Sequence, residues 1–205
     1  MIPKMIQSDE GRPLATIGYL DDDMEGNLIK YVAEGMSYST IFLREVMASM
    51  FNKHEDHAEG MVGYLYRAPI FKEDRKSIIA EGIKSYVVGN HLVAAHILIP
   101  QVEEALRSLA ELSGSAILRQ NRVGGFQYVA LHELLKEASV IKILGDDMTW
   151  YFRILFTDQR GWNLRNNICH GLVPQGIFGT EITDRIVHAL ICLGTVRHAD
   201  EESTL

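Results

Sequence analysis

The sequence predicts a mainly α-helical protein with one small β-hairpin, and three observations support this prediction. Apolar residues recur at helical spacing through most of the 205 residues. The helical pattern stops at residues 116–129, where two short extended runs flank a turn that contains glycine. The composition is that of an ordinary globular protein, with 47% hydrophobic and 23% charged residues.

The first 70 residues are predicted to form an arm and a helical segment. Residues 1–23 are rich in proline and glycine, and they end in an acidic run that can cap the next helix. That helix is expected from Met24 to Met50, with a break at Gly35. Its expected apolar face consists of Ile29, Val32, Met36, Ile41, Leu43, Val46 and Met50. Residues 52–70 show no clear pattern.

The region from residue 71 to residue 199 is predicted to be a helical domain, followed by an acidic tail over 200–205. A helix is expected from Phe71 to Val88, where Gly89 ends it. The strongest pattern runs from His91 to Leu112, and Pro100 is expected to kink or split that helix. After the hairpin at 116–129 we expect a short helix at 131–136, an apolar patch at 140–144, and longer helices at 145–156 and 180–197.

The charge distribution excludes some kinds of partner. The net charge is −7, but the acidic excess lies in the first 60 residues and in the tail, so that residues 61–199 are close to neutral. No broad basic stripe is present for tight binding through many phosphates. A compact site for one or two phosphates remains compatible with this distribution.

The sequence favours a cytoplasmic protein without a membrane segment. There is no run of about 18 or more apolar residues. The first residues lack the apolar core of a secretion signal, and only two cysteines, Cys169 and Cys192, are present. His54 and His57 have metal-compatible spacing, but no further ligand accompanies them, and we expect no metal site.

The segment Trp162–Gly171 concentrates functional residue types, and we call it the motif segment. It contains Arg165, two amides that follow it and His170. An arginine can hold a phosphate and a histidine can move a proton near neutral pH. Gly171 predicts that the helix ends at His170, where the helix dipole favours the imidazolium form. Residues five apart are about 140° apart around a regular helix, so Arg165 and His170 do not share a face.

The motif segment resembles a known family signature. Arg165-Asn166-x-x-x-His170-Gly171 is similar to the Arg-x(4–6)-His motif of the HEPN superfamily of ribonucleases. Residues 75–197 resemble more narrowly an uncharacterised-domain family defined by an Arg-Asn-x-x-x-His-Gly signature. The shared phrases are Ile99-Pro100-Gln101-Val102-Glu103, Leu106-Arg107, Leu131-x-x-Leu134-Leu135 and Gly161-x-Asn163-Leu164. In longer members this domain is C-terminal.

The resemblance implies a HEPN-like helical bundle that forms a homodimer and places two motifs near the dimer axis. HEPN ribonucleases cut RNA without a metal or cofactor, and family members act as toxins and phage-defence effectors. A neutralising partner or an upstream partner domain is therefore expected besides RNA.

The resemblance also suggests a role for each residue of the site. His170 would assist proton transfer, Arg165 would stabilise the charged phosphate, and Asn166 would orient the arginine or the phosphate. Glu103 or Glu104 would position Arg165. Asn163, Asn167 and Arg160 are candidates for contacts with the substrate.

The same residues admit alternatives without catalysis. Arg165 and Asn166 would satisfy carbonyl groups at the end of a helix, and His170 would serve as a cap. The chain would then be a helical module that binds RNA, a nucleotide or a partner protein within a larger defence protein. Cys169 is not expected to act as a nucleophile beside His170, because adjacent helical residues point about 100° apart.

Overall fold

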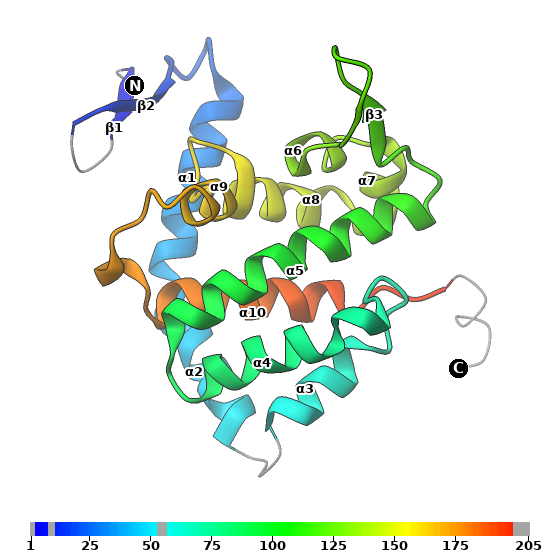
Figure 1. Ribbon diagram of the computed structural model, residues 1–205. Coiled ribbons are helices and arrows are strands. Elements are labelled where there is room, and N and C mark those ends of the chain that lie inside the picture. The colour runs from blue at the N-terminus through cyan, green and yellow to red at the C-terminus, as the bar shows by residue number, and fades with distance from the viewer. Residues whose placement is uncertain (1–2, 8–10, 53–56, 199–205) are drawn as a thin grey trace.

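The structure is a computed structural model that describes residues 3–7, 11–52 and 57–198, and it is mainly helical, as predicted (Figure 1). The α-helices are α1 (Met24–Tyr38), α2 (Thr40–Asn52), α3 (His57–Leu65), α4 (Lys76–Val87), α5 (His91–Leu112), α6 (Leu131–Leu134), α7 (Ala138–Leu144), α8 (Asp146–Phe152), α9 (Leu164–Cys169) and α10 (Thr180–Leu193). A π-helix, η2 (Arg153–Thr157), follows α8, and 3-10 turns lie at η1 (Glu73–Arg75) and η3 (Gln175–Ile177). The strands β1 (Lys4–Gln7) and β2 (Pro13–Ile17) form one antiparallel hairpin, and β3 (Leu118–Gln120) and β4 (Phe126–Tyr128) form another.

Helix α5 lies at the centre of the fold, alongside α4 and α10 (Figure 1). The side chain of Asn90 caps its first turn by accepting a hydrogen bond from the Val93 amide at 3.4 Å. The helix continues through Pro100 as one element, so the predicted split does not occur. Its buried face joins the core through Ala94, Ala95, Leu98, Ile99, Val102, Leu106 and Leu109.

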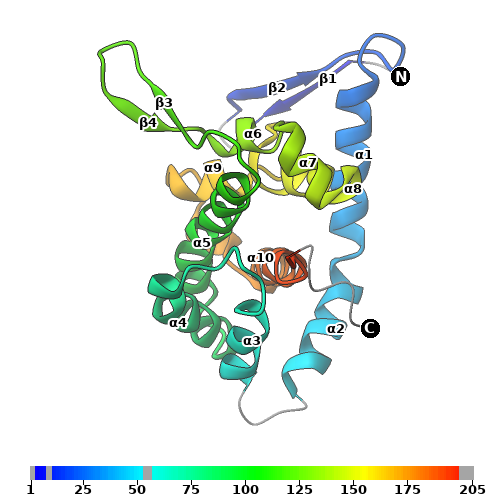
Figure 2. The same ribbon diagram turned by 90° about the vertical axis from the view of Figure 1, so that its right-hand side faces the viewer.

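Helices α1 and α2 run down one side of the molecule (Figure 2). Asp23 caps α1, as predicted, since its carboxylate accepts a hydrogen bond from the Gly26 amide at 2.9 Å. The predicted break at Gly35 is wrong, because the helix ends at Tyr38. The hydroxyls of Ser39 and Thr40 both donate to the Met36 carbonyl, at 3.0 and 3.1 Å. Such side-chain hydrogen bonds compete with those of the helix backbone, and they lie where α1 ends and α2 begins.

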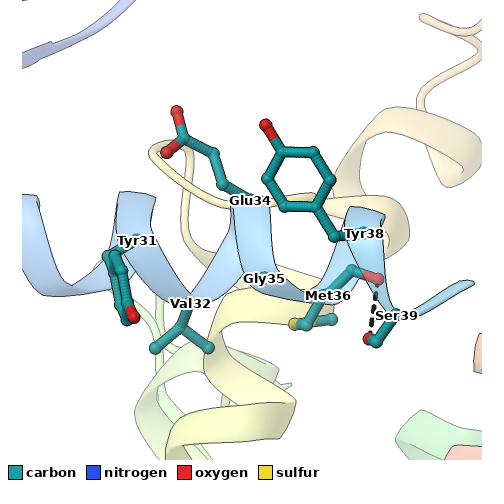
Figure 3. A pocket seen from close by; sticks show the side chains of 7 residues that line it. All are labelled: Tyr31, Val32, Glu34, Gly35, Met36, Tyr38 and Ser39. Atoms are coloured by element: carbon teal, nitrogen blue, oxygen red, sulfur yellow. Dashed lines mark hydrogen bonds between the residues drawn. The ribbon is translucent and has the colours of Figure 1, made fainter.

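The apolar residues of α1 and α2 lie on two faces, one buried in the core and one exposed. The single apolar face predicted from the sequence contains residues of both. Ile29, Met36 and Met47 belong to the core, whereas Ile41 and Val46 are exposed. A pocket of about 580 Å³ lies along the second half of α1, and Figure 3 shows Glu34 and Tyr38 projecting away from Val32 and Met36. The large apolar side chains that these two helices expose are Met24, Leu28, Tyr31, Tyr38, Ile41, Phe42, Val46 and Met50.

Several elements were not predicted from the sequence, among them the 3-10 turn η3. The N-terminal arm contains the β1–β2 hairpin, and the unpatterned region 52–70 contains α3. The helix expected from residue 145 to residue 156 stays α-helical only to Phe152 and continues as the π-helix η2. The hairpin predicted at 116–129 is confirmed as β3–β4, with Arg119 paired to Gln127, and the last helix ends at Leu193 rather than at Arg197.

A single buried cluster includes side chains from both sides of the predicted boundary at residue 70, for example Ile29 and Leu65 together with Leu106, Phe156 and Leu190. His54 and the acidic tail 200–205 lie outside the described residues. None of the helices in the described part of the chain combines the length and the apolar character that crossing a bilayer requires.

Candidate functional site

The motif segment begins in a tight connection to the π-helix. The amide of Trp162 donates a hydrogen bond to the Ile154 carbonyl at 2.9 Å. A Cβ atom at Gly161 would overlap that same carbonyl, so only glycine permits this approach. Asn163 then adopts a left-handed conformation, with φ 50°, which asparagine tolerates better than most residues. The chain thus turns sharply into α9.

The end of α9 follows the sequence prediction. His170 is the C-cap, and Gly171 takes a positive φ of 67°. The Gly171 amide donates to the Ile168 carbonyl at 3.1 Å and the Leu172 amide donates to the Asn167 carbonyl at 2.8 Å, which together form a Schellman motif. The His170 ring is exposed and makes no hydrogen bond or ion pair with any residue that the structure describes.

Glu103 of α5 holds Arg165. The Arg165 Nε atom donates to Glu103 Oε2 at 2.7 Å, and Nη2 lies 3.4 Å from Oε1. The Arg165 side chain is 28% exposed and that of Glu103 is 13% exposed. The hydrogen bond to Glu103 raises the pKa of the guanidinium, so Arg165 keeps its charge. The contact expected for Glu103 is therefore present, while its role in a reaction stays a prediction.

A chain of amides continues from Arg165 along the motif segment. Arg165 Nη1 donates to Asn166 Oδ1 at 3.1 Å, and Asn166 Nδ2 donates to Asn163 Oδ1 at 2.7 Å. Asn163 in turn donates to Asn167 Oδ1 at 3.3 Å, and Asn167 donates to the Trp162 carbonyl at 3.2 Å. Asn166 thus sits where it can orient Arg165. Asn163 and Asn167, expected to contact substrate, use their amides within the protein.

Glu104 does not contact Arg165, unlike Glu103. It accepts hydrogen bonds from Arg107 at 2.6 Å and from Lys72 at 3.0 Å. Arg107 also donates to Glu103 at 2.7 Å, so Glu103 joins two guanidinium groups. Sequence reasoning gave Arg107 no role, although its spacing of three and four residues from the two glutamates on α5 favours these pairs.

Arg160 is not brought together with Arg165 and His170. Its Nε and Nη2 atoms donate to the two oxygens of Asp158, at 3.0 and 2.9 Å, and Nη2 also lies 3.2 Å from Glu25 of α1. The expected contact of Arg160 with substrate at the motif therefore has no support from this geometry.

Within one chain, Arg165 and His170 remain separate. No hydrogen bond joins their side chains in the described residues, and Arg165 turns toward α5 while His170 stands exposed at the end of α9. Cys169 precedes His170 directly, and partial desolvation of its thiol raises its pKa, which opposes a nucleophilic thiolate at neutral pH. One chain thus presents a fixed guanidinium and a free imidazole at two places on one short helix.

In the described ranges of the chain, no group of three or more histidine, cysteine, aspartate or glutamate side chains is arranged to hold a metal ion. Comparisons of the chain with protein-family models, with curated proteins and with solved structures find no match in any of the three.

Proposed function

We propose that this protein is a metal-independent endoribonuclease of the HEPN type, with a helical bundle of that family and a site made by Arg165, Asn166 and His170. The supporting observation is that the Arg165 side chain has partners within the chain and the His170 side chain has none among the described residues. Glu103 and Asn166 fix Arg165 through hydrogen bonds, and a fixed position suits a group that stabilises negative charge. His170 is exposed and can transfer a proton.

Arg165 retains capacity for a phosphate in this arrangement. A guanidinium carries five N–H donors, and Glu103 and Asn166 use three of those of Arg165. The remaining donors suit a phosphate oxygen, and the fixed position lowers the cost of organising the site when negative charge develops.

The proposed reaction is an internal transesterification. The 2′-hydroxyl of a ribose loses its proton, its oxygen attacks the adjacent phosphorus, and the bond from phosphorus to the 5′-oxygen breaks. The 5′-oxygen takes up a proton, so the products carry a 2′,3′-cyclic phosphate and a 5′-hydroxyl, and no water is consumed. His170 transfers a proton, and Arg165 stabilises the crowded phosphate.

Two chains would complete the site. Arg165 and His170 lie about 140° apart around a regular helix, and α9 is a regular helix from Leu164 to Cys169. A homodimer that places two copies of α9 against each other would bring the imidazole of one chain close to the guanidinium of its partner. The protein would then act on RNA in the manner of a toxin or a phage-defence effector.

The test is cleavage of labelled single-stranded RNA in the presence of a chelator. We expect cleavage by the wild type and a loss of about 100-fold or more in both Arg165→Ala and His170→Ala. The matched controls are Arg75→Ala, which removes a half-exposed arginine, and His198→Ala, which removes an exposed histidine. Equal cleavage by all five proteins would indicate a contaminant and would overturn the proposal.

The alternative is a helical module that binds RNA, a nucleotide or a partner protein without cutting it. One observation favours this alternative, because Glu103 already neutralises Arg165. RNA that stays intact but binds the wild type more tightly than Arg165→Ala would establish the binding module in place of the enzyme.

A further inference from the structure

We propose that the pocket between β2, α1, α6 and η2 binds a phosphoryl group, and that Glu25 occupies the position of this ligand when the pocket is free. The pocket has a volume of about 360 Å³. This volume falls within the range of about 300–1,000 Å³ that is typical of small-ligand sites. We call it the Glu25 pocket, and it is distinct from the proposed RNA-cleaving site at α9.

One carboxylate oxygen marks the position of the ligand. Glu25 Oε1 accepts hydrogen bonds from Arg153 Nη2 at 2.7 Å and from Arg160 Nη2 at 3.2 Å. Two guanidinium groups that converge on one oxygen form the arrangement that also binds phosphate oxygens. The hydrogen bond from Arg153 lowers the pKa of Glu25, so the carboxylate is anionic at neutral pH.

The two arginines are held rigidly before any ligand arrives. Asp158 accepts three hydrogen bonds from Arg160, including one from its backbone amide. The Arg153 guanidinium stacks over the Trp150 ring, 4.7 Å from its centroid. Arg153 is also the first residue of the π-helix η2, and π-helical turns occur often at functional sites. These contacts hold both arginines in place where they line the pocket.

The charge balance favours exchange of Glu25 for a phosphate. Lys136 and His132 line the same pocket, and neither has an ion-pair partner among the residues that the structure describes. The side chain of Glu25 is 51% exposed, whereas that of Asp158 is 13% exposed. Glu25 can therefore swing into solvent, while Asp158 stays. Asp23, whose Oδ1 atom lies 3.7 Å from Arg160 Nη1, also stays. Three cations, Arg153, Arg160 and Lys136, would then stand against the two carboxylates of Asp23 and Asp158, which leaves a net positive charge for the phosphate.

The test is calorimetric titration of the full chain with inorganic phosphate, adenosine monophosphate and adenosine at low ionic strength. We expect the first two ligands to bind and adenosine not to bind, because the phosphoryl group carries the recognition. Stronger binding of the nucleotide than of inorganic phosphate would identify a nucleotide as the source of the group, and equal binding would identify free phosphate. None of these ligands has a phosphodiester bond to cut, so the outcome is independent of the proposed nuclease.

Two variants should change the affinity for phosphate in opposite directions. Glu25→Gln removes the competing charge and should tighten binding by about fivefold, whereas Lys136→Gln should weaken it by about fivefold, each a shift of about 1 kcal/mol. Lys142→Gln, at an exposed lysine outside the pocket, is the matched control and should not change the affinity. Absence of phosphate binding at millimolar concentration, or Glu25→Gln that binds no tighter than the wild type, would overturn the proposal.

Discussion

The pair of Arg165 and Glu103 connects the motif segment to the central helix of the fold. Glu103 is 62 residues away from Arg165 in sequence, on the central helix α5, and it also binds Arg107. Helical periodicity cannot predict such a pair, because it describes only the face on which a residue lies. The resemblance to the HEPN family pointed to Glu103 and Glu104, and the structure distinguishes between them, since only Glu103 contacts Arg165.

Replacement of Glu103 tests how much this pair stabilises the protein. Glu103→Gln leaves Arg165 and Arg107 without their shared anion in a partly buried place. We expect the free energy of unfolding to fall by about 2 kcal/mol, since hydrogen bonds to charged groups contribute about 1.5–3 kcal/mol. Urea denaturation at neutral pH measures this change.

The control for Glu103 lies on the same helix. Glu111 is 54% exposed and sits 3.5 Å from Lys72, so Glu111→Gln should change the free energy of unfolding by less than about 0.5 kcal/mol. Equal effects of the two substitutions would show that the Arg165–Glu103 pair contributes no more than a surface ion pair.

Among the elements, the helices with strong apolar periodicity could be predicted from the sequence. The elements without a distinctive pattern of apolar residues could not. Helix α5 follows its predicted bounds from His91 to Leu112. The β1–β2 hairpin has mostly exposed strands, so no alternation of buried and exposed apolar residues marks it in the sequence. The π-helix η2 also has no pattern of its own, because it continues the buried stripe of α8 through Ile154, Leu155 and Phe156.

Two glycines within helices give a prediction with opposite signs. A Cβ atom at Gly82 of α4 would overlap the side chains of Leu98 and Ile97 on α5, whereas nothing lies within 4 Å of a Cβ atom at Gly35 of α1. Gly82→Ala should therefore destabilise the protein by about 1–3 kcal/mol, because α4 and α5 must move apart. Gly35→Ala should stabilise it by about 0.5–1 kcal/mol, since alanine favours the helix.

Thermal unfolding of both variants measures the two effects. A destabilising Gly35→Ala would contradict the expectation that alanine favours the helix at this position. A stabilising Gly82→Ala would contradict the expected overlap of a Cβ atom with Leu98 and Ile97.

At the scale of the whole molecule, the motif segment connects several parts of the fold. Trp162 donates a hydrogen bond from its indole nitrogen to the Ala33 carbonyl of α1, Arg165 binds α5, and the backbone of the segment is bound to η2. This anchoring fixes α9 relative to the core but leaves its last residue, His170, exposed. The sequence predicted a functional segment here, but it could not predict that Arg160 would be turned away toward Glu25 and Asp158.

The most direct test of the proposed function is identification of the ends that the wild-type protein leaves on RNA in excess chelator. A short oligoribonucleotide and its twin with 2′-deoxyribose at every position are incubated with the protein, and the products are resolved by mass spectrometry. We predict fragments with 2′,3′-cyclic phosphate and 5′-hydroxyl ends from the ribose strand and no cleavage of the deoxyribose strand. Intact RNA, cleavage of the deoxyribose strand, or fragments with 3′-hydroxyl and 5′-phosphate ends would contradict the account.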